Sequence, residues 1–158
     1  MRSLLLVPLL VAALAGGCGK KKSEVDRLAD DATDVVLPDI RAKIAAGTPG
    51  DAIPCSRVTA NVDVLEREGY AELAKDIHQV CDHDLPIAHL KLETETAEAA
   101  RKAAPDEKVL RACFNGKLSV AVERLARARR VDDEARGLIA RFNQVCPENP
   151  VEGTDLAP

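Results

Sequence analysis

Two stretches of the chain, LAKDIHQVC (residues 73–81) and LIARFNQVC (residues 138–146), share the pattern that decides the fold. Each begins with leucine, has an apolar residue four positions later, and ends with Gln-Val-Cys. Each is also preceded by a cysteine that is followed by valines seven and nine residues later. Between these landmarks the apolar residues recur at three- and four-residue steps, which is typical of amphipathic helices. We therefore predict one helical hairpin that is used twice, over residues 55–81 and 113–146.

The four cysteines of these units are predicted to pair within each unit: Cys55 with Cys81, and Cys113 with Cys146. In an antiparallel hairpin, residues that are equidistant from the turn lie side by side, within reach of a disulfide. Each pair is about equidistant from its expected turn, and disulfides are typical of exported proteins. Four cysteines permit two other connectivities, which would join the two hairpins to each other. A helix over residues 86–104 would be long enough to allow them.

Helical spacing extends over residues 24–146, so the predicted fold class is all-α. The architecture is a helical bundle built from two disulfide-closed antiparallel helical hairpins plus an N-terminal helix. Pro38 should break or kink that N-terminal helix, and Pro86 should open a separate helix between the hairpins. Residues 47–54 are rich in glycine and proline and form a connector. Residues 147–158 have the composition of a disordered tail.

The amino-terminal end of the chain has the pattern of a secretory signal followed by a cysteine. A short positive start precedes an apolar run of h-region length, and the small residues AGG stand directly before Cys18. This pattern resembles the lipobox of bacterial lipoproteins, although Ala15 replaces the leucine that the family favours three positions before the cysteine. The resemblance implies that residues 1–17 are a signal peptide and that Cys18 is the lipidated first residue of the mature chain. The alternative is an ordinary signal peptide cut nearby, which would leave Cys18 as an unpaired thiol.

Residues 18–23 would then form a lipidated tether. Three consecutive lysines, Lys20, Lys21 and Lys22, would lie at the lipid surface, where cations are attracted to anionic headgroups. The resemblance therefore implies a protein of the bacterial cell envelope that is lipid-anchored through Cys18 and faces the periplasm. Gly19 follows the cysteine, where an aspartate would retain enterobacterial lipoproteins at the inner membrane, so the resemblance favours the outer membrane.

The composition and the absence of known motifs argue against several classes of function, but they do not indicate a particular reaction. The chain is acidic, with 26 Asp and Glu against 22 Lys and Arg, so we do not expect it to bind nucleic acid. The aromatic residues are one tyrosine and two phenylalanines, too few for stacking sites for sugars or bases. No Gly-rich phosphate loop, redox CxxC pair or nucleophile–base motif is present. We predict a non-enzymatic binding or structural role without a cofactor, with an envelope protein, cell-wall glycan or lipid as the partner. A hydrolase is a more remote alternative, since serines and carboxylates are present.

One segment, HQVCDHD (residues 78–84), gathers the side chains that could bind a metal ion. It contains two histidines, a cysteine and two aspartates, and His89 follows in the next predicted helix. Imidazole, thiolate and carboxylate are ligands of zinc and copper. The alternative function is therefore an envelope metal-binding protein that uses His78, His83 and His89. A disulfide would withdraw Cys81 from such a site, and the second unit has asparagine where the first has its first histidine.

A cationic segment, ERLARARR (residues 123–130), places Arg124, Arg127 and Arg130 along one side of a helix. This side could bind an anionic glycan or phospholipid. It could equally be a solvated face, because Glu123 and several acidic residues after position 131 are available as neighbours.

Overall fold

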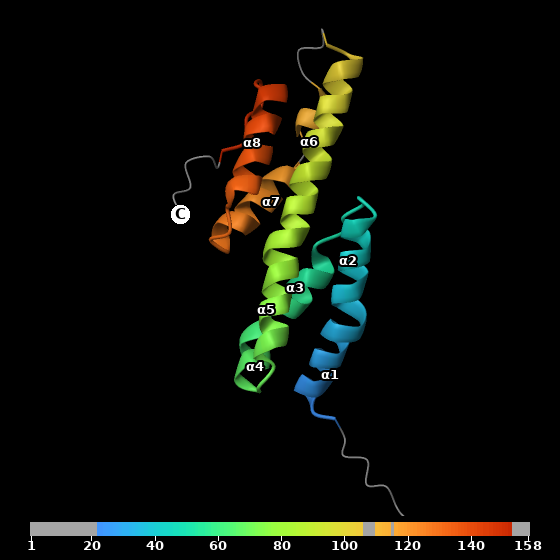
Figure 1. Ribbon diagram of the computed structural model, residues 1–158, viewed down its shortest axis with the longest axis vertical. Coiled ribbons are helices and arrows are strands. Elements are labelled where there is room, and N and C mark those ends of the chain that lie inside the picture. Colours follow the sequence, from blue (N-terminus) through green and yellow to red (C-terminus); the bar gives the residue numbers. More distant parts are fainter. Residues whose placement is uncertain (1–21, 106–109, 115, 153–158) are drawn as a thin grey trace, which may run out of the picture.

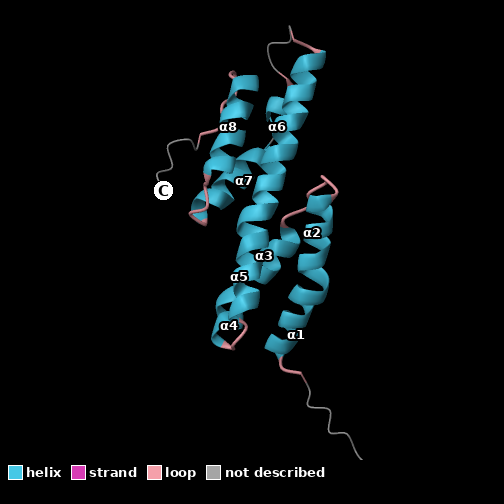
Figure 2. Cartoon of the chain, viewed as in Figure 1, coloured by secondary structure: helices cyan, strands magenta, loops and turns pink. Residues whose placement is uncertain are grey.

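The computed structural model describes residues 22–105, 110–114 and 116–152 of the chain. All regular secondary structure in this described part is helical, as Figure 2 shows. The all-α prediction is therefore confirmed for these residues. Residues 1–17, Cys18 and most of the predicted tether lie outside them.

A long helical spine runs through the middle of the molecule (Figure 1). It consists of α5 (Ala71–Gln79), the π-helical turn η2 (Val80–Asp84) and α6 (Leu85–Ala103), which follow one another without a break. A second continuous helix packs beside the amino-terminal part of this spine and is made of α1 (Glu24–Asp31), η1 (Ala32–Val36) and α2 (Leu37–Ala45). The remaining elements are α3 (Ile53–Thr59), α4 (Val62–Arg67), η3 (Arg111–Phe114), α7 (Gly116–Arg127) and α8 (Asp133–Val145).

Pro38 was expected to break or kink its helix, and it lies within a continuous helical run from α1 to α2. Pro86 stands in the first turn of α6, as expected, but α6 continues directly from α5 through η2 and is not a separate helix. A π turn precedes each proline: the N–H of Leu37 bonds to the carbonyl of Ala32, and that of Leu85 to Val80. A proline has no N–H and its ring clashes with the carbonyl one turn earlier. A wider π turn shifts the hydrogen bonding by one residue, and the helix continues past the proline.

The apolar core consists of two clusters that divide at Pro86. The first includes buried residues from Ala29 to Leu85, and the second includes buried residues from Ile87 to Cys146. We call the two parts of the molecule the first half and the second half. The halves lie along different stretches of the spine, as Figure 1 shows.

Each half contains one buried disulfide, with the pairing that the sequence predicted: Cys55–Cys81 in the first half and Cys113–Cys146 in the second. The Cα atoms are 5.4 Å apart in the first pair and 5.6 Å in the second. Neither bond joins one half to the other. The halves are therefore linked covalently through the spine helix alone.

The two units differ in how their helices pack. In the first half, α4 and α5 contact each other across a turn at Gly69, whose φ of +95° favours glycine. In the second half, α7 and α8 each pack mainly on α6 rather than on each other. The carboxyl-terminal part of α6 permits this close approach because its inward residues are the alanines Ala97 and Ala100.

Residues 147–152, which were expected to belong to a disordered tail, fold back onto the second half. The side chain of Asn143 accepts a hydrogen bond from the N–H of Val151 and donates one to its carbonyl, at 2.8 and 3.1 Å. Val151 also packs against the second core cluster. Composition alone missed these contacts because they depend on a polar residue within α8.

Candidate functional site

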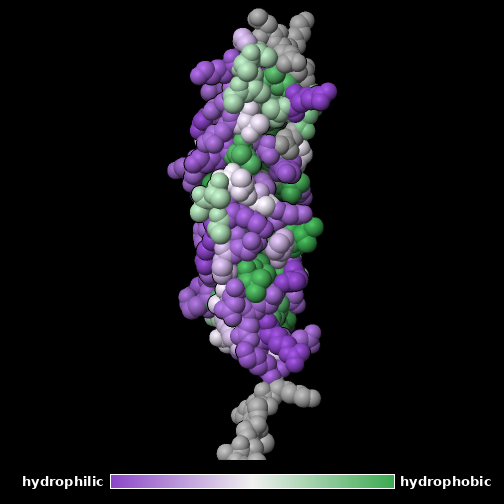
Figure 3. Space-filling view, turned by 90° about the vertical axis from the view of Figure 1, so that its right-hand side faces the viewer, coloured by the Kyte–Doolittle hydropathy of each residue, from purple (hydrophilic) through white to green (hydrophobic). Residues whose placement is uncertain are grey.

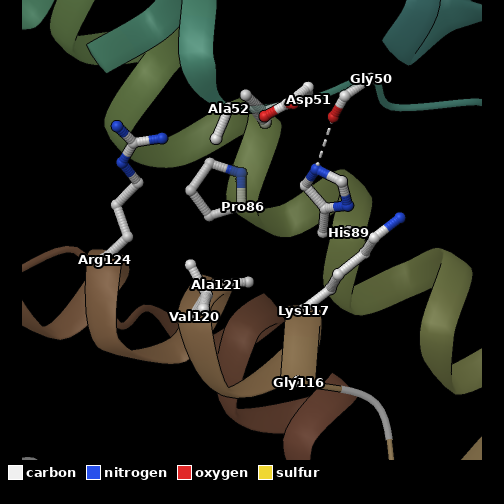
Figure 4. A pocket seen from close by; sticks show the side chains of 11 residues that line it. Gly50, Asp51, Ala52, Pro86, His89, Gly116, Lys117, Val120, Ala121 and Arg124 are labelled. Carbon is white, nitrogen blue, oxygen red and sulfur yellow. Dashed lines mark hydrogen bonds between the residues drawn. The ribbon is translucent and has the colours of Figure 1, made fainter.

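A hollow of about 370 Å³ lies where the two halves meet (Figure 4). We call it the junction groove. It is lined by residues 50–52 of the connector, by Leu85, Pro86 and His89 of α6, and by Gly116, Lys117, Val120, Ala121 and Arg124 of α7. Its volume lies within the range of small-ligand sites, which are usually apolar with a few placed polar groups.

His89 holds the connector against α6. Its Nε2 lies 3.0 Å from the carbonyl oxygen of Gly50, which can only accept, so Nε2 carries the hydrogen. Burial lowers the pKa of His89, and the imidazole is therefore neutral near pH 7. Its Nδ1 is buried without a hydrogen-bond partner in the described part of the chain. His89 thus positions one wall of the groove.

The groove has a cation at each end and apolar side chains between them. Lys117 and Arg124 both extend from α7 toward the connector, with Pro86, Val120 and Ala121 between them (Figure 4). The Arg124 guanidinium is held in place, because one nitrogen lies 3.9 Å from the Asp82 carboxylate and another 3.4 Å from the Ser56 hydroxyl.

Apolar side chains stand exposed at the rim of the groove. Val120 is 58% exposed, and Ile53, next to Ala52 of the lining, is 70% exposed. On the face of the molecule shown in Figure 3, hydrophilic residues predominate and hydrophobic ones lie in separate patches. That face presents no broad apolar surface, whereas the junction groove adjoins two exposed apolar side chains.

A second hollow, of about 540 Å³, lies on the other side of Arg124. It includes all three arginines that the sequence placed on one side of a helix, together with His78 and Asp82. Arg127 forms an ion pair with Glu123, and Arg130 donates to the Gln79 side chain at 2.7 Å. The arginines therefore have neighbours, as the solvated-face alternative predicted, and they also line a hollow.

The three histidines of the metal-binding alternative do not converge. His78 lies 2.7 Å from Asp82, His83 lies between Asp84 and Asp132, and His89 faces the connector. Cys81 is in a disulfide, and the described residues contain no group of three or more His, Cys, Asp or Glu placed to hold a metal ion. The histidines point apart because the chain is helical throughout this region, where a helix end and a loop were expected.

His83 instead connects the spine to the second half. Its Nδ1 lies 2.9 Å from Asp84, and its Nε2 lies 2.8 Å from Asp132, which also accepts the N–H of Ala135 and caps α8. Burial by itself would lower the pKa of His83, but the hydrogen bonds and charges of the two aspartates outweigh it and raise the pKa. The Ala135 N–H, followed by His83, lowers the pKa of Asp132.

The stability of the fold should depend on pH through His83. The pKa of His83 is higher in the folded chain than in the unfolded chain, where it is about 6.5. The protonated imidazole therefore stabilises the fold fully below about pH 6.5, and this stabilisation is lost as the pH rises through the folded-state pKa. We expect the difference in unfolding free energy between wild type and His83→Gln to be larger at about pH 5.5 than at about pH 8.5. Urea unfolding across this range measures it.

His89 has a lowered pKa, which gives stability the opposite pH dependence. Because His89 is present in both the wild type and His83→Gln, its contribution cancels in the difference between them. Asp132→Asn is the matched control, because asparagine also caps helices but carries no charge to hold the imidazolium. The pH dependence due to His83 should be smaller in this variant. A difference between wild type and His83→Gln that stays constant or grows with pH would contradict the role of His83.

The sequence singled out Arg124 and His89 of the groove but not Lys117, Val120 or the connector residues. Val120 is one of the valines shared by the two units, but its counterpart Val62 is buried, so the repeat does not mark Val120 as a site residue. Of the predicted tether, only its last two residues are described, and Lys22 pairs with Asp30 of α1 at 2.5 Å. Cys18, Lys20 and Lys21 lie outside the described residues.

Comparison with protein-family models, with curated proteins and with solved structures gives no match for the chain. A search of the described helices for a membrane span finds none that is long and apolar enough.

Proposed function

We propose that this chain is a lipid-anchored protein of the bacterial cell envelope whose helical domain is a non-enzymatic binding module. The lipobox-like sequence that ends at Cys18 supports the anchor, and the junction groove supports the binding role. In this proposal, two disulfide-closed antiparallel hairpins hold the groove. The connector and α6, which flank the first hairpin, form one side of the groove, and the second hairpin contributes α7.

The observation that carries the binding role is the chemistry of the groove. Its lining is mainly apolar, and a cation stands at each end. His89 is the one imidazole of the lining, and its Nε2–H is bonded to the connector. This arrangement suits a site that holds a ligand.

The position of the groove suits a protein that is anchored at its amino-terminal end. The described chain begins at Lys22, four residues after Cys18, and α1 starts at the end of the molecule opposite the carboxyl-terminal end of α6 (Figure 1). The groove lies between these ends, at the junction of the halves. An anchor at Cys18 would therefore leave the groove and the second half free to meet a partner.

Site-specific photocrosslinking in the native cell tests the binding role. A benzophenone amino acid at Val120, on the rim of the groove, should give a discrete crosslinked product on irradiation. Position 72 is the matched control, because Glu72 is 87% exposed and lies in α5, outside the residues that line the groove. Absence of a product from position 120, or the same products from both positions, would contradict the proposal.

A further inference from the structure

We infer that the junction groove binds an extended acidic peptide segment of a partner protein, with two carboxylates about 10 Å apart and an apolar residue between them. This inference rests on the proposed binding function and names its ligand. Three features of the groove support it: the spacing of its cations, the apolar surface between them, and backbone N–H groups of the connector that have no partner among the described residues.

The charges of the groove favour an anionic ligand. Lys117 and Arg124 are the permanent cations of the lining, and Asp51 is its one carboxylate among the described lining residues. The Asp51 side chain already accepts the N–H of Ile53 at the start of α3. The lining therefore carries one more permanent cation than carboxylate, and Asp82, outside the lining, lies 3.9 Å from Arg124. Such a region attracts acidic segments and disfavours basic ones.

The spacing of the cations fits an extended chain. Lys117 and Arg124 are seven residues apart on α7, which is about 10 Å at 1.5 Å per residue. A peptide in the extended polyproline II conformation advances about 3.1 Å per residue with three residues per turn, so acidic residues three positions apart lie on the same side, roughly 9 Å from each other. Side chains between them would lie over Val120 and Ala121. Val120 is exposed and gains burial when it is covered.

The connector favours a peptide over a lipid or a glycan. The N–H groups of Gly50, Asp51 and Ala52 make no hydrogen bond within the described part of the chain. A peptide backbone supplies carbonyl groups that can accept from them, as in other modes of peptide recognition. A lipid acyl chain has no such acceptors. Sugar rings commonly stack on aromatic side chains, and the described lining contains no aromatic residue.

Fluorescence polarisation with the full chain as purified from the cell, both disulfides intact, tests this inference. The probe is a fluorescein-labelled peptide, Gly-Glu-Val-Leu-Glu-Gly, which is blocked at its carboxyl end. Two matched peptides replace either both glutamates with glutamine or the central Val-Leu with Ser-Gly. We expect the first peptide to bind at least about tenfold more tightly than either matched peptide, and its binding to weaken as salt is raised.

Variants locate the binding. Lys117→Gln and Arg124→Gln should each weaken binding of the acidic peptide at least about fivefold. Lys75→Gln removes the same charge from α5, away from the groove, and should change nothing. Circular dichroism and thermal unfolding of each variant establish that it is folded. Because Arg124 contacts Asp82 and Ser56, Lys117→Gln is the second test should Arg124→Gln be unstable.

Equal binding of the acidic and glutamine peptides, or no binding at millimolar concentration, would overturn the inference. So would binding of phosphatidylglycerol vesicles that depends on Lys117 and Arg124 while the peptide does not bind. A crosslink from position 120 that persists when no peptide binds would refute the ligand and retain the binding function. If position 120 gives no crosslink and the acidic peptide does not bind, the binding function and the peptide ligand are both refuted.

Discussion

Replacing Cys113 and Cys146 together with alanine is expected to lower the free energy of unfolding by about 3–4 kcal/mol. The bond closes a loop with a sequence separation of 33, and removing it restores conformational entropy to the unfolded chain. A typical domain has a stability of about 5–15 kcal/mol, so the loss would be a large share of the total. Guanidinium unfolding followed by far-ultraviolet circular dichroism without reductant measures it.

The paired replacement of Cys55 and Cys81 is the matched comparison. Its loop has a sequence separation of 26, so the chain-entropy relation predicts a loss smaller by only a few tenths of a kcal/mol. Both bonds are buried, and replacing both partners with alanine adds no thiol that could exchange with the remaining disulfide. A loss below about 1 kcal/mol for either pair would contradict the role of the disulfides in holding the two halves.

Truncation of Phe142 to alanine is expected to lower the unfolding free energy by about 3–5 kcal/mol. Phe142 is 1% exposed in α8 and belongs to the second core cluster, which contains no other aromatic side chain among its described members. The cluster is built from aliphatic residues and alanines, so the cavity left behind has few large neighbours that could fill it. Urea or guanidinium unfolding gives the value.

Phe114→Ala is the control that the chain itself supplies, because Phe114 and Phe142 are its two phenylalanines. Phe114 is 63% exposed, and its truncation should change the unfolding free energy by no more than about 0.5 kcal/mol. Similar losses in the two variants would mean that the packing of α8 differs from that described above.

The helices and the disulfide pairing could be predicted because both depend on regular spacing. The continuity of the helices through Pro38 and Pro86 could not. The local rule that proline ends a helix is overridden here by a π turn before each proline. The same continuity explains why His78, His83 and His89, the ligands of the metal-binding alternative, point to separate partners.

The groove was beyond prediction because it joins three distant segments. Its connector, Pro86 and the cations of α7 come together only after both halves have packed on the spine. The partners of the histidines are also remote: Gly50 lies 39 residues from His89, and Asp132 lies 49 residues from His83. No short sequence pattern contains such pairs. Arg124 could be singled out because it belongs to a dense cationic run.

The lipid anchor is tested most directly by the intact mass of the chain isolated from bacterial membranes. The predicted result is a polypeptide that begins at Cys18 and carries the added mass of a diacylglyceryl group, with or without one further acyl group on its amino terminus. A chain that retains residues 1–17, begins at another residue, or carries an unmodified Cys18 thiol would contradict the proposed envelope lipoprotein.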